Sequence, residues 1–276
     1  MKKKHFGIIG KPLSHSLSPE LHNYWLKKYK IFGDYSLMEI NLNEIKETID
    51  QIRNNNLQGI NVTTPYKQAV IPYLDLLIDD AKETLSVNTI SLNEKGKVVG
   101  NNTDVYGLEQ GFIQKLHGQN LEQKKVLILG AGGVTASVIY ALFKNKFKNI
   151  YISNKTYEKA ENIKKKFAFI EIVEWKDVEK AAQGMDIIIN ATSLGMKGGN
   201  NFNQEFKNLK TDLVYYDIIY NPAETIMIKE LGKRNIQTYN GLEMFIYQGQ
   251  RSFFLWNNIN PESDKELEQK IISKLK

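Results

Sequence analysis

Two kinds of hydrophobic pattern alternate along the chain. Short apolar runs are typical of buried strands, and longer segments with apolar residues every three or four positions are typical of helices. In the first hundred residues, strands are predicted at 6–9, 35–40, 57–62, 87–92 and 98–100. Helices are predicted from an N-cap at Ser18, over 42–52, after Thr64-Pro65 and over 75–85. This alternation predicts an α/β layer.

The second half repeats the alternation with more regular spacing. Strands are predicted near 126–129, 150–153, 170–173, 186–190 and 213–217. Helices are predicted at 105–116, 134–143, 223–234, 242–257 and 265–275. A strand that alternates with a helix at each step is typical of a doubly wound parallel sheet of the Rossmann type. The predicted fold class is therefore α/β with two domains.

One glycine-rich turn stands between a predicted strand and a predicted helix. The apolar run 125–129 is followed by the turn residues Gly130, Ala131, Gly132 and Gly133, and the predicted helix begins at Val134. Gly130 and Gly132 match the first two positions of the dinucleotide-binding fingerprint, whereas Thr135 occupies its third small position. Backbone N–H groups and a helix N-terminus meet at such a turn, which suits a pyrophosphate. The alternative interpretation is a plain strand-to-helix turn.

The next strand ends in residues that bear on the choice of cofactor. An NAD site usually places Asp or Glu there to accept from the ribose hydroxyls. This chain has Asn154, Lys155 and Thr156 instead, and Lys159 follows. Cations and a hydroxyl suit a 2′-phosphate, so NADP(H) is the predicted cofactor. The alternative is that both lysines only face water.

Composition restricts the classes of function. The 276 residues are 42% hydrophobic and include no cysteine, which excludes disulfides, thiolate metal sites and a cysteine nucleophile. Four scattered histidines lack metal-ligand spacing, so no metal is expected. The net charge of +6 is spread among 31 acidic residues, which favours a solvated lysine-rich surface over nucleic-acid binding. We predict neither a signal peptide nor a membrane span, and we expect a cytoplasmic location.

Four polar stretches fall at predicted strand ends or loops, where ligands of α/β sheets bind. They are Ser14 to Pro19, Asn61 to Lys67, Val87-Asn88-Thr89 and Gly100 to Asp104. Each has an ordinary explanation when taken alone: turn residues, helix caps, loop amides and a solvated lysine. Together, hydroxyls, amides, one cation and one anion are the groups that a polyhydroxylated acid needs.

These motifs, in this order, resemble the shikimate dehydrogenase family over nearly the whole chain. The resemblance extends to Asn190 to Met196, Tyr216 to Pro222, and Gly241 to Met244 leading to Gln248. It implies reversible NADPH-dependent reduction of 3-dehydroshikimate to shikimate in aromatic amino-acid biosynthesis, by an oxidoreductase acting on a CH-OH group. It further implies an α/β substrate-binding domain over 1–103 plus 240–276, and a Rossmann-type NADP-binding domain over 104–239.

The resemblance also implies a role for each matching residue. Lys67 and Asp104 match the catalytic pair, and Ser14 and Ser16 match hydroxyls that hold the substrate carboxylate. Further substrate contacts are implied at Asn61, Thr63, Asn88, Tyr220 and Gln248. The implied cofactor contacts are Gly130, Ala131, Gly132, Gly133, Val134, Asn154, Lys155, Thr156, Lys159, Ile218 and Gly241. Because a neighbouring carboxylate favours the ammonium form of lysine, Lys67 is expected to act as a charged donor.

Some points stay open. The family often has Arg where this chain has Lys155 and Lys159, and a lysine lacks the fork-like grip of a guanidinium on phosphate. Leu85-Ser86 stand where Gly-Ala is common. A quinate/shikimate dehydrogenase that uses NAD or NADP shares the motifs, and a non-catalytic NADP-binding sensor is a second alternative. The expected partners are the small substrate alone, with neither nucleic acid nor membrane, and the chain is expected to be a monomer or homodimer.

Overall fold

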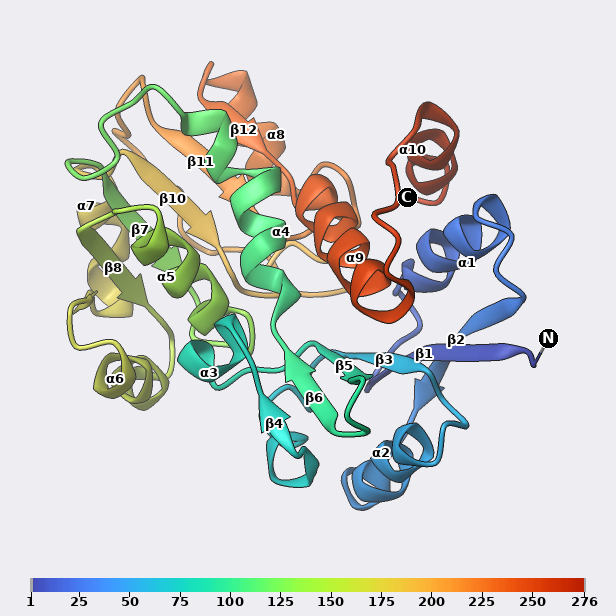
Figure 1. The fold of residues 1–276 in the computed structure, drawn as a ribbon. Coiled ribbons are helices and arrows are strands. Elements are labelled where there is room, and N and C mark those ends of the chain that lie inside the picture. Colours follow the sequence, from blue (N-terminus) through green and yellow to red (C-terminus); the bar gives the residue numbers. More distant parts are fainter. Residues whose placement is uncertain (1, 276) are drawn as a thin grey trace. The chain divides into compact units, whose positions relative to one another are not determined.

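The computed structural model describes residues 2–275, which form two compact units. The first unit comprises residues up to Gly107 together with 246–274, and the second comprises Leu108–Phe245. Each unit contains a six-stranded sheet (Figure 1). The domain boundaries expected from the sequence are 103/104 and 239/240. In the structure, the chain passes from one compact unit to the other at 107/108 and 245/246.

The sheet of the first unit is mixed. Its strands are β1 (Lys4–Gly10), β2 (Gly33–Glu39), β3 (Gly59–Val62), β4 (Leu76–Leu77), β5 (Thr89–Leu92) and β6 (Val98–Asn101), in the order β2-β1-β3-β5-β6-β4. The strands β1, β2 and β3 run parallel, and β5 runs antiparallel to both of its neighbours, β3 and β6. The reversal brings the start of β5 to the same sheet edge as the ends of β3 and β6.

Helices and buried strand residues form the core of the first unit. The helices are α1 (Ser18–Lys28), α2 (Ile45–Arg53), α3 (Asp80–Thr84) and α10 (Lys265–Ile272), and the unit boundaries fall within α4 (Thr103–Gly111) and α9 (Leu242–Asn257). On α2, the spacing Ile45, Ile49, Ile52 presents one apolar face, which packs against Ile60 and Ile90 of the sheet. The α/β layer predicted from the periodicity is therefore present.

Two helix predictions and one cap are wrong in this unit. No regular helix follows Thr64-Pro65. Turns lead instead to a short 3₁₀ segment, Ile71–Tyr73, which contains Pro72. The segment 75–85 is the strand β4 followed by the short α3, because Asp79 adopts φ of +47° between them and prevents a continuous helix. Ser18 is the first helical residue, and its side chain makes no capping bond.

The second unit has a fully parallel sheet. Its strands are β7 (Lys125–Leu129), β8 (Asn149–Ser153), β9 (Glu171–Ile172), β10 (Ile187–Asn190), β11 (Val214–Asp217) and β12 (Gln237–Tyr239), in the order β12-β11-β10-β7-β8-β9. The helices are α5 (Thr135–Lys144), α6 (Tyr157–Lys166), α7 (Val178–Ala182) and α8 (Ile226–Lys233). This is the doubly wound Rossmann order, with its switch point between β7 and β10. The fold class is confirmed, although the three-residue β12 was not predicted.

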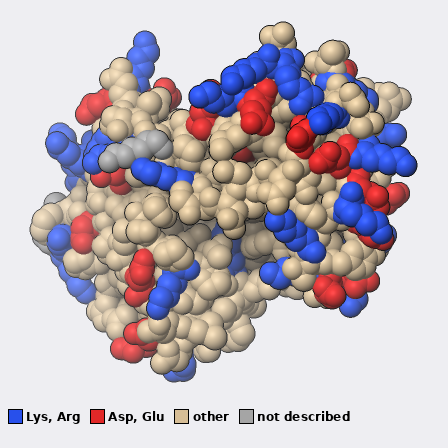
Figure 2. All heavy atoms as spheres, turned by 180° about the vertical axis from the view of Figure 1, so that it is seen from behind, with Lys and Arg blue, Asp and Glu red and all other residues tan. Residues whose placement is uncertain are grey.

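Apolar side chains from α7 and α8 cover one face of this parallel sheet. Leu127, Ile188 and Tyr215 from the strands pack there with Val178 and Leu231 from the helices. The surface charges are mixed, since basic and acidic side chains are interspersed on the face in Figure 2. None of the helices within residues 2–275 has both the length and the apolar character needed to span a membrane.

Candidate active site

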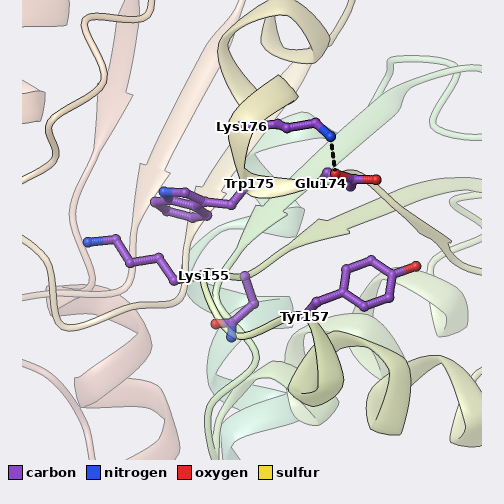
Figure 3. A pocket seen from close by; sticks show the side chains of 6 residues that line it. Lys155, Tyr157, Glu174, Trp175 and Lys176 are labelled. Atoms are coloured by element: carbon purple, nitrogen blue, oxygen red, sulfur yellow. Dashed lines mark ion pairs between the residues drawn. The ribbon is translucent and has the colours of Figure 1, made fainter.

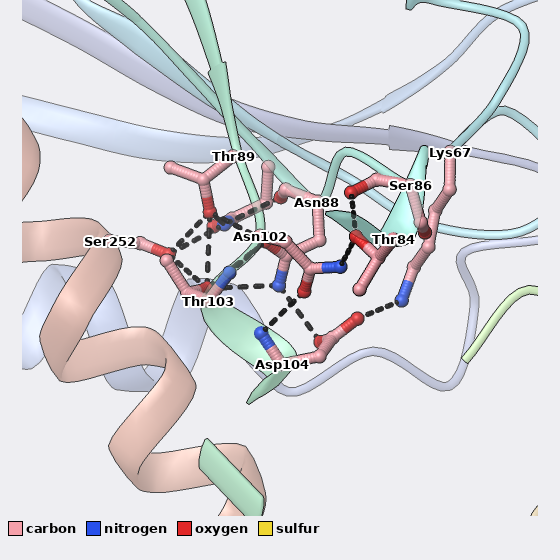
Figure 4. A network of polar contacts seen from close by, with 10 residues as sticks. Lys67, Thr84, Ser86, Asn88, Thr89, Asn102, Thr103, Asp104 and Ser252 are labelled. Atoms are coloured by element: carbon pink, nitrogen blue, oxygen red, sulfur yellow. Dashed lines mark hydrogen bonds and ion pairs between the residues drawn. The ribbon is translucent and has the colours of Figure 1, made fainter. Parts of the chain in front are cut away.

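An ammonium and a carboxylate meet at the edge of the first sheet where β3 and β6 end. The Lys67 Nζ atom lies 2.5 Å from Oδ2 of Asp104, and their side chains are 11% and 9% exposed. Lys67 follows β3, and Asp104 lies in the first turn of α4 directly after β6. Figure 4 shows the two side chains reaching toward each other from these separate segments. The predicted pair is therefore brought together by the fold.

Asn88 fixes the other carboxylate oxygen of Asp104. Its Nδ2 donates to Oδ1 of Asp104 at 2.8 Å and to Oγ1 of Thr103 at 2.9 Å, and its Oδ1 accepts from the Thr103 N–H at 2.7 Å. The register that pairs Thr89 with Asn101 places Asn88 beside this turn. Because both donors and the oxygen of this buried amide already have partners, Asn88 acts here as a support for Asp104.

A second buried amide, that of Asn61, also has hydrogen-bond partners. Tyr35 donates its phenol hydrogen to Oδ1 of Asn61 at 2.8 Å, and Asn61 Nδ2 lies 3.0 Å from the Ser252 hydroxyl. Ser252 has no exposed surface and also lies 2.8 Å from Oγ1 of Thr89 and 3.2 Å from Oγ1 of Thr103 (Figure 4). Sequence reasoning missed Ser252, although it lies one helical turn after Gln248 on a helix that the periodicity predicted.

The remaining predicted substrate residues of this unit lie near the same strand ends. Ser14 and Ser16 are in the loop after β1; Ser14 is exposed, and Ser16 Oγ donates to Ser18 Oγ at 3.1 Å. Thr63 follows β3 and packs so closely on Gly10 that a Cβ at Gly10 would lie 2.4 Å from its methyl carbon. Gln248 is on α9, where its carbonyl accepts from the Ser252 hydroxyl at 3.0 Å.

In the second unit, the glycine turn has the shape of a phosphate cradle. Gly130 directly follows β7 with φ of +110°, and an added Cβ would lie 2.9 Å from the Ala191 carbonyl, so glycine is required there. Beside Gly132, in contrast, the nearest atom to an added Cβ is 4.0 Å away. Gly132 and Gly133 are exposed, and the N-terminus of α5 follows at Thr135. Open space beside exposed backbone at a helix start fits a dinucleotide pyrophosphate.

Asn154 holds this turn in place. Its Oδ1 accepts from the Ala131 N–H at 3.0 Å, and its Nδ2 donates to the Thr156 carbonyl at 2.8 Å. The amide at the end of β8 therefore stabilises the loop instead of presenting a carboxylate to a ribose. Lys155, Thr156 and Lys159 are exposed beside it, which leaves two cations and a hydroxyl open to a ligand.

The turn after β11 lies against the start of α9. A Cβ at Gly241 would lie 1.9 Å from the Ile218 carbonyl oxygen, so only glycine permits this approach. Asp217 supports the same turn by accepting from the Ile219 N–H at 3.0 Å and from Thr225 Oγ1 at 2.9 Å. Burial raises the pKa of Asp217 to about 6 against the opposing effect of these hydrogen bonds. Tyr220 follows in this turn and stacks on Phe245, with ring centroids 4.4 Å apart.

A Rossmann-type unit with a phosphate cradle, together with a polar unit that pairs an ammonium with a carboxylate, defines a dinucleotide-dependent oxidoreductase. Two family models match the chain: the shikimate dehydrogenase substrate binding domain over residues 8–90, and shikimate / quinate 5-dehydrogenase over residues 113–197. The chain therefore belongs to the shikimate dehydrogenase family, which confirms the family predicted from its motifs.

Individual relatives match over nearly the full length. The shikimate dehydrogenase (NADP(+)) of Pelagibacter ubique is 45% identical, with 96% of this chain and 97% of the relative covered. The crystal structure of shikimate dehydrogenase from Aquifex aeolicus has a TM-score of 0.88 at 34% identity, covering 98% and 97% of the two chains. Quinate dehydrogenase from Corynebacterium glutamicum in complex with NAD also has a TM-score of 0.88, at 26% identity with 99% and 100% covered.

Proposed function

We propose that this chain catalyses the reversible NADPH-dependent reduction of 3-dehydroshikimate to shikimate, with Lys67 and Asp104 as its catalytic pair. The observation that carries the proposal is the short contact between these two side chains at the edge of the first sheet. The NADP(+) named for the Pelagibacter relative supports the cofactor. The first unit is the substrate-binding domain, and the second is the NADP-binding domain.

The role of Lys67 follows from the charge that develops during reduction. When bound, NADPH supplies the hydride for the carbonyl carbon of the substrate. The carbonyl oxygen then gains negative charge, which the Lys67 ammonium stabilises before it donates the proton that completes the alcohol. Asp104 orients this ammonium, and Asn88 prevents the carboxylate from rotating away. In the oxidation direction the same steps run in reverse.

The other substrate contacts are assigned by the chemistry of their side chains. The hydroxyls of Ser14 and Ser16 bind the substrate carboxylate, and Thr63, Gln248 and Tyr220 bind ring hydroxyls. Asn61 and Asn88 contribute mainly as fixed supports, because their amide groups are already hydrogen-bonded within the first unit. A direct contact of the Asn88 amide with the substrate requires exchange of one of these bonds, whereas Asn61 Oδ1, which accepts from Tyr35, has a second lone pair.

The cofactor contacts divide into three groups. The backbone from Gly130 to Val134 binds the pyrophosphate at the start of α5. Lys155, Thr156 and Lys159 bind the 2′-phosphate, with Asn154 holding the turn. Ile218 and Gly241 lie beside the nicotinamide.

The proposal is tested by following NADPH absorbance with 3-dehydroshikimate, beside quinate with NAD. We expect turnover of 3-dehydroshikimate and a preference for NADPH over NADH of about 10- to 100-fold, because two exposed lysines supply roughly 1–3 kcal/mol of binding to the 2′-phosphate. Faster turnover of quinate with NAD would identify the chain as a quinate dehydrogenase. If the chain neither reduced 3-dehydroshikimate nor oxidised quinate, the non-catalytic NADP-binding sensor would be favoured.

A variant of Lys67 tests the mechanism itself. We expect Lys67→Ala to lower kcat by about 10³, with a smaller change in substrate KM, because the charge it stabilises exists mainly in the transition state. Lys82→Ala, which removes an exposed lysine on α3 of the same unit, is the matched control. Near-normal kcat in Lys67→Ala would remove this residue from the catalytic role.

A further inference from the structure

An open pocket lies where β8 and β9 end, next to the glycine turn. It is lined by Asn154, Lys155, Tyr157, Glu174, Trp175 and Lys176, and its volume is about 360 Å³. Small-molecule sites typically have volumes of about 300–1,000 Å³. The proposed function accounts for Asn154 and Lys155 on the β8 side of this pocket. It gives no role to Trp175, which comes from the segment after β9.

Trp175 contacts both the core and a cation. Its indole stacks on Phe202, with ring centroids 6.5 Å apart and an interplanar angle of 18°. Phe202 itself packs on the apolar cluster beneath α7 and α8. The Lys155 Nζ atom lies 5.7 Å from the centroid of the indole, within the range of a cation–π contact. Figure 3 shows Lys155 extending along the same side as the indole.

The other charges at the pocket neutralise each other. Lys176 Nζ lies 2.6 Å from Oε2 of Glu174, on the far side of the pocket from the Lys155 ammonium (Figure 3). Within residues 2–275, Lys155 has no carboxylate partner, and its ammonium contacts the indole. The positive charge that an anionic ligand meets in this pocket is therefore that of Lys155, and its position is set by Trp175.

We propose that Trp175 is a positioning residue that determines the preference of this chain for NADP over NAD, acting through Lys155. The inference rests on the proposed use of NADP(H) and deepens it. A lysine has a long flexible stem and binds phosphate only as a point charge, so ordering it costs conformational entropy. The indole already restricts Lys155 over the pocket, and this reduces the entropy lost when a 2′-phosphate binds. Trp175 thus compensates in part for the presence of lysine at position 155, where the family often has an arginine that grips phosphate with two N–H groups.

The test measures binding of nucleotide fragments that differ only in the 2′-phosphate. Calorimetry with 2′,5′-ADP and 5′-AMP is run on the unmodified chain, Trp175→Leu, Trp175→Phe and Lys155→Met. We expect Trp175→Leu to weaken 2′,5′-ADP binding about 2- to 5-fold and to leave 5′-AMP binding unchanged, since an exposed cation–π contact contributes about 0.5–1 kcal/mol. Trp175→Phe keeps a weaker ring contact and should lose less.

The double variant decides whether Trp175 acts through Lys155. In the Lys155→Met background, Trp175→Leu should cause no further loss of 2′,5′-ADP affinity, because the coupled contact is already absent. Equal weakening of 2′,5′-ADP and 5′-AMP, or the same loss in the Lys155→Met background, would overturn the proposal. If the leucine variant does not fold, the phenylalanine variant supplies the same comparison. Calorimetry measures binding without turnover. Its outcome is therefore independent of the absorbance assay that tests the proposed dehydrogenase activity.

Discussion

The buried imidazole of His22 makes the stability of the first unit depend on pH. His22 lies on α1 with 1% of its surface exposed, and its ring stacks on Tyr35 with centroids 4.4 Å apart. Neither ring nitrogen has a hydrogen-bond partner within residues 2–275. Trp25 and Trp256 complete the apolar surroundings, at centroid distances of 5.6 and 5.2 Å. Burial therefore disfavours the charged ring and lowers the pKa of His22 from 6.5 to about 3.

The size of the effect follows from the two protonation states. Between pH 6.5 and about 3, the unfolded chain binds a proton on His22 that the folded chain excludes. The free energy of unfolding therefore falls as the pH falls through this window. A pH of about 4.5 lies roughly two units below the pKa of the histidine in the unfolded chain. Protonation of the unfolded chain therefore lowers the free energy of unfolding by about 2–3 kcal/mol relative to neutral pH.

His22→Phe removes this proton while preserving the ring stack. Between neutral pH and pH 4.5, we expect the free energy of unfolding to fall by about 2–3 kcal/mol less in the variant than in the unmodified chain. Urea unfolding at both pH values, followed by tryptophan fluorescence, measures the difference; Trp25 and Trp256 both report on the first unit. His15→Gln, which removes an exposed histidine of the same unit, is the control. If His22→Phe and the unmodified chain showed the same pH dependence, His22 would not be the responsible group.

Two further substitutions probe the supports of the site. We expect Gly241→Ala to destabilise the chain by about 1–3 kcal/mol and to weaken NADP⁺ binding in calorimetry, because its Cβ collides with the Ile218 carbonyl. Gly232→Ala on α8, where an added Cβ meets nothing within 4 Å, should be neutral or stabilising; equal effects of the two would refute the steric argument. Ser252→Ala should cost about 1–2 kcal/mol of stability in thermal unfolding and raise substrate KM more than NADPH KM. Ser273→Ala, at an exposed hydroxyl, should change neither, and a Ser252→Ala variant with unchanged substrate KM would show that the buried network does not position the site.

The fold was predictable where a single local pattern determines an element. The apolar run before Gly130 and the periodicity of 242–257 each matched a strand or helix. Prediction was wrong at 75–85, where the helical spacing of apolar residues was overridden by the left-handed backbone of Asp79. The strand β12 was missed because its three residues, Gln237–Tyr239, are too few to show alternation.

The candidate site was predictable only in part. The Lys67 and Asp104 side chains could be named from motifs, and the fold places them in contact. The engagement of Asn88 depends on the antiparallel reversal of β5, which no local pattern reports. Ser252 and Trp175 were missed because each acts through contacts with residues distant in sequence. Helical spacing from Gln248 was the one signal that pointed toward Ser252.

The return of the chain to the first unit sets the order in which that unit is completed during synthesis. The Trp256 ring lies against Gly59, and its Nε1 donates to the Ile90 carbonyl at 3.0 Å. Ser252 joins the buried amides of the same sheet. The ribosome releases these residues only after it has made the whole Rossmann-type unit, although domains otherwise tend to fold from the N-terminus onward. One face of the sheet in the first 107 residues therefore stays uncovered until residues 246–274 are synthesised. A chain truncated before residue 246 lacks the helix that covers this face.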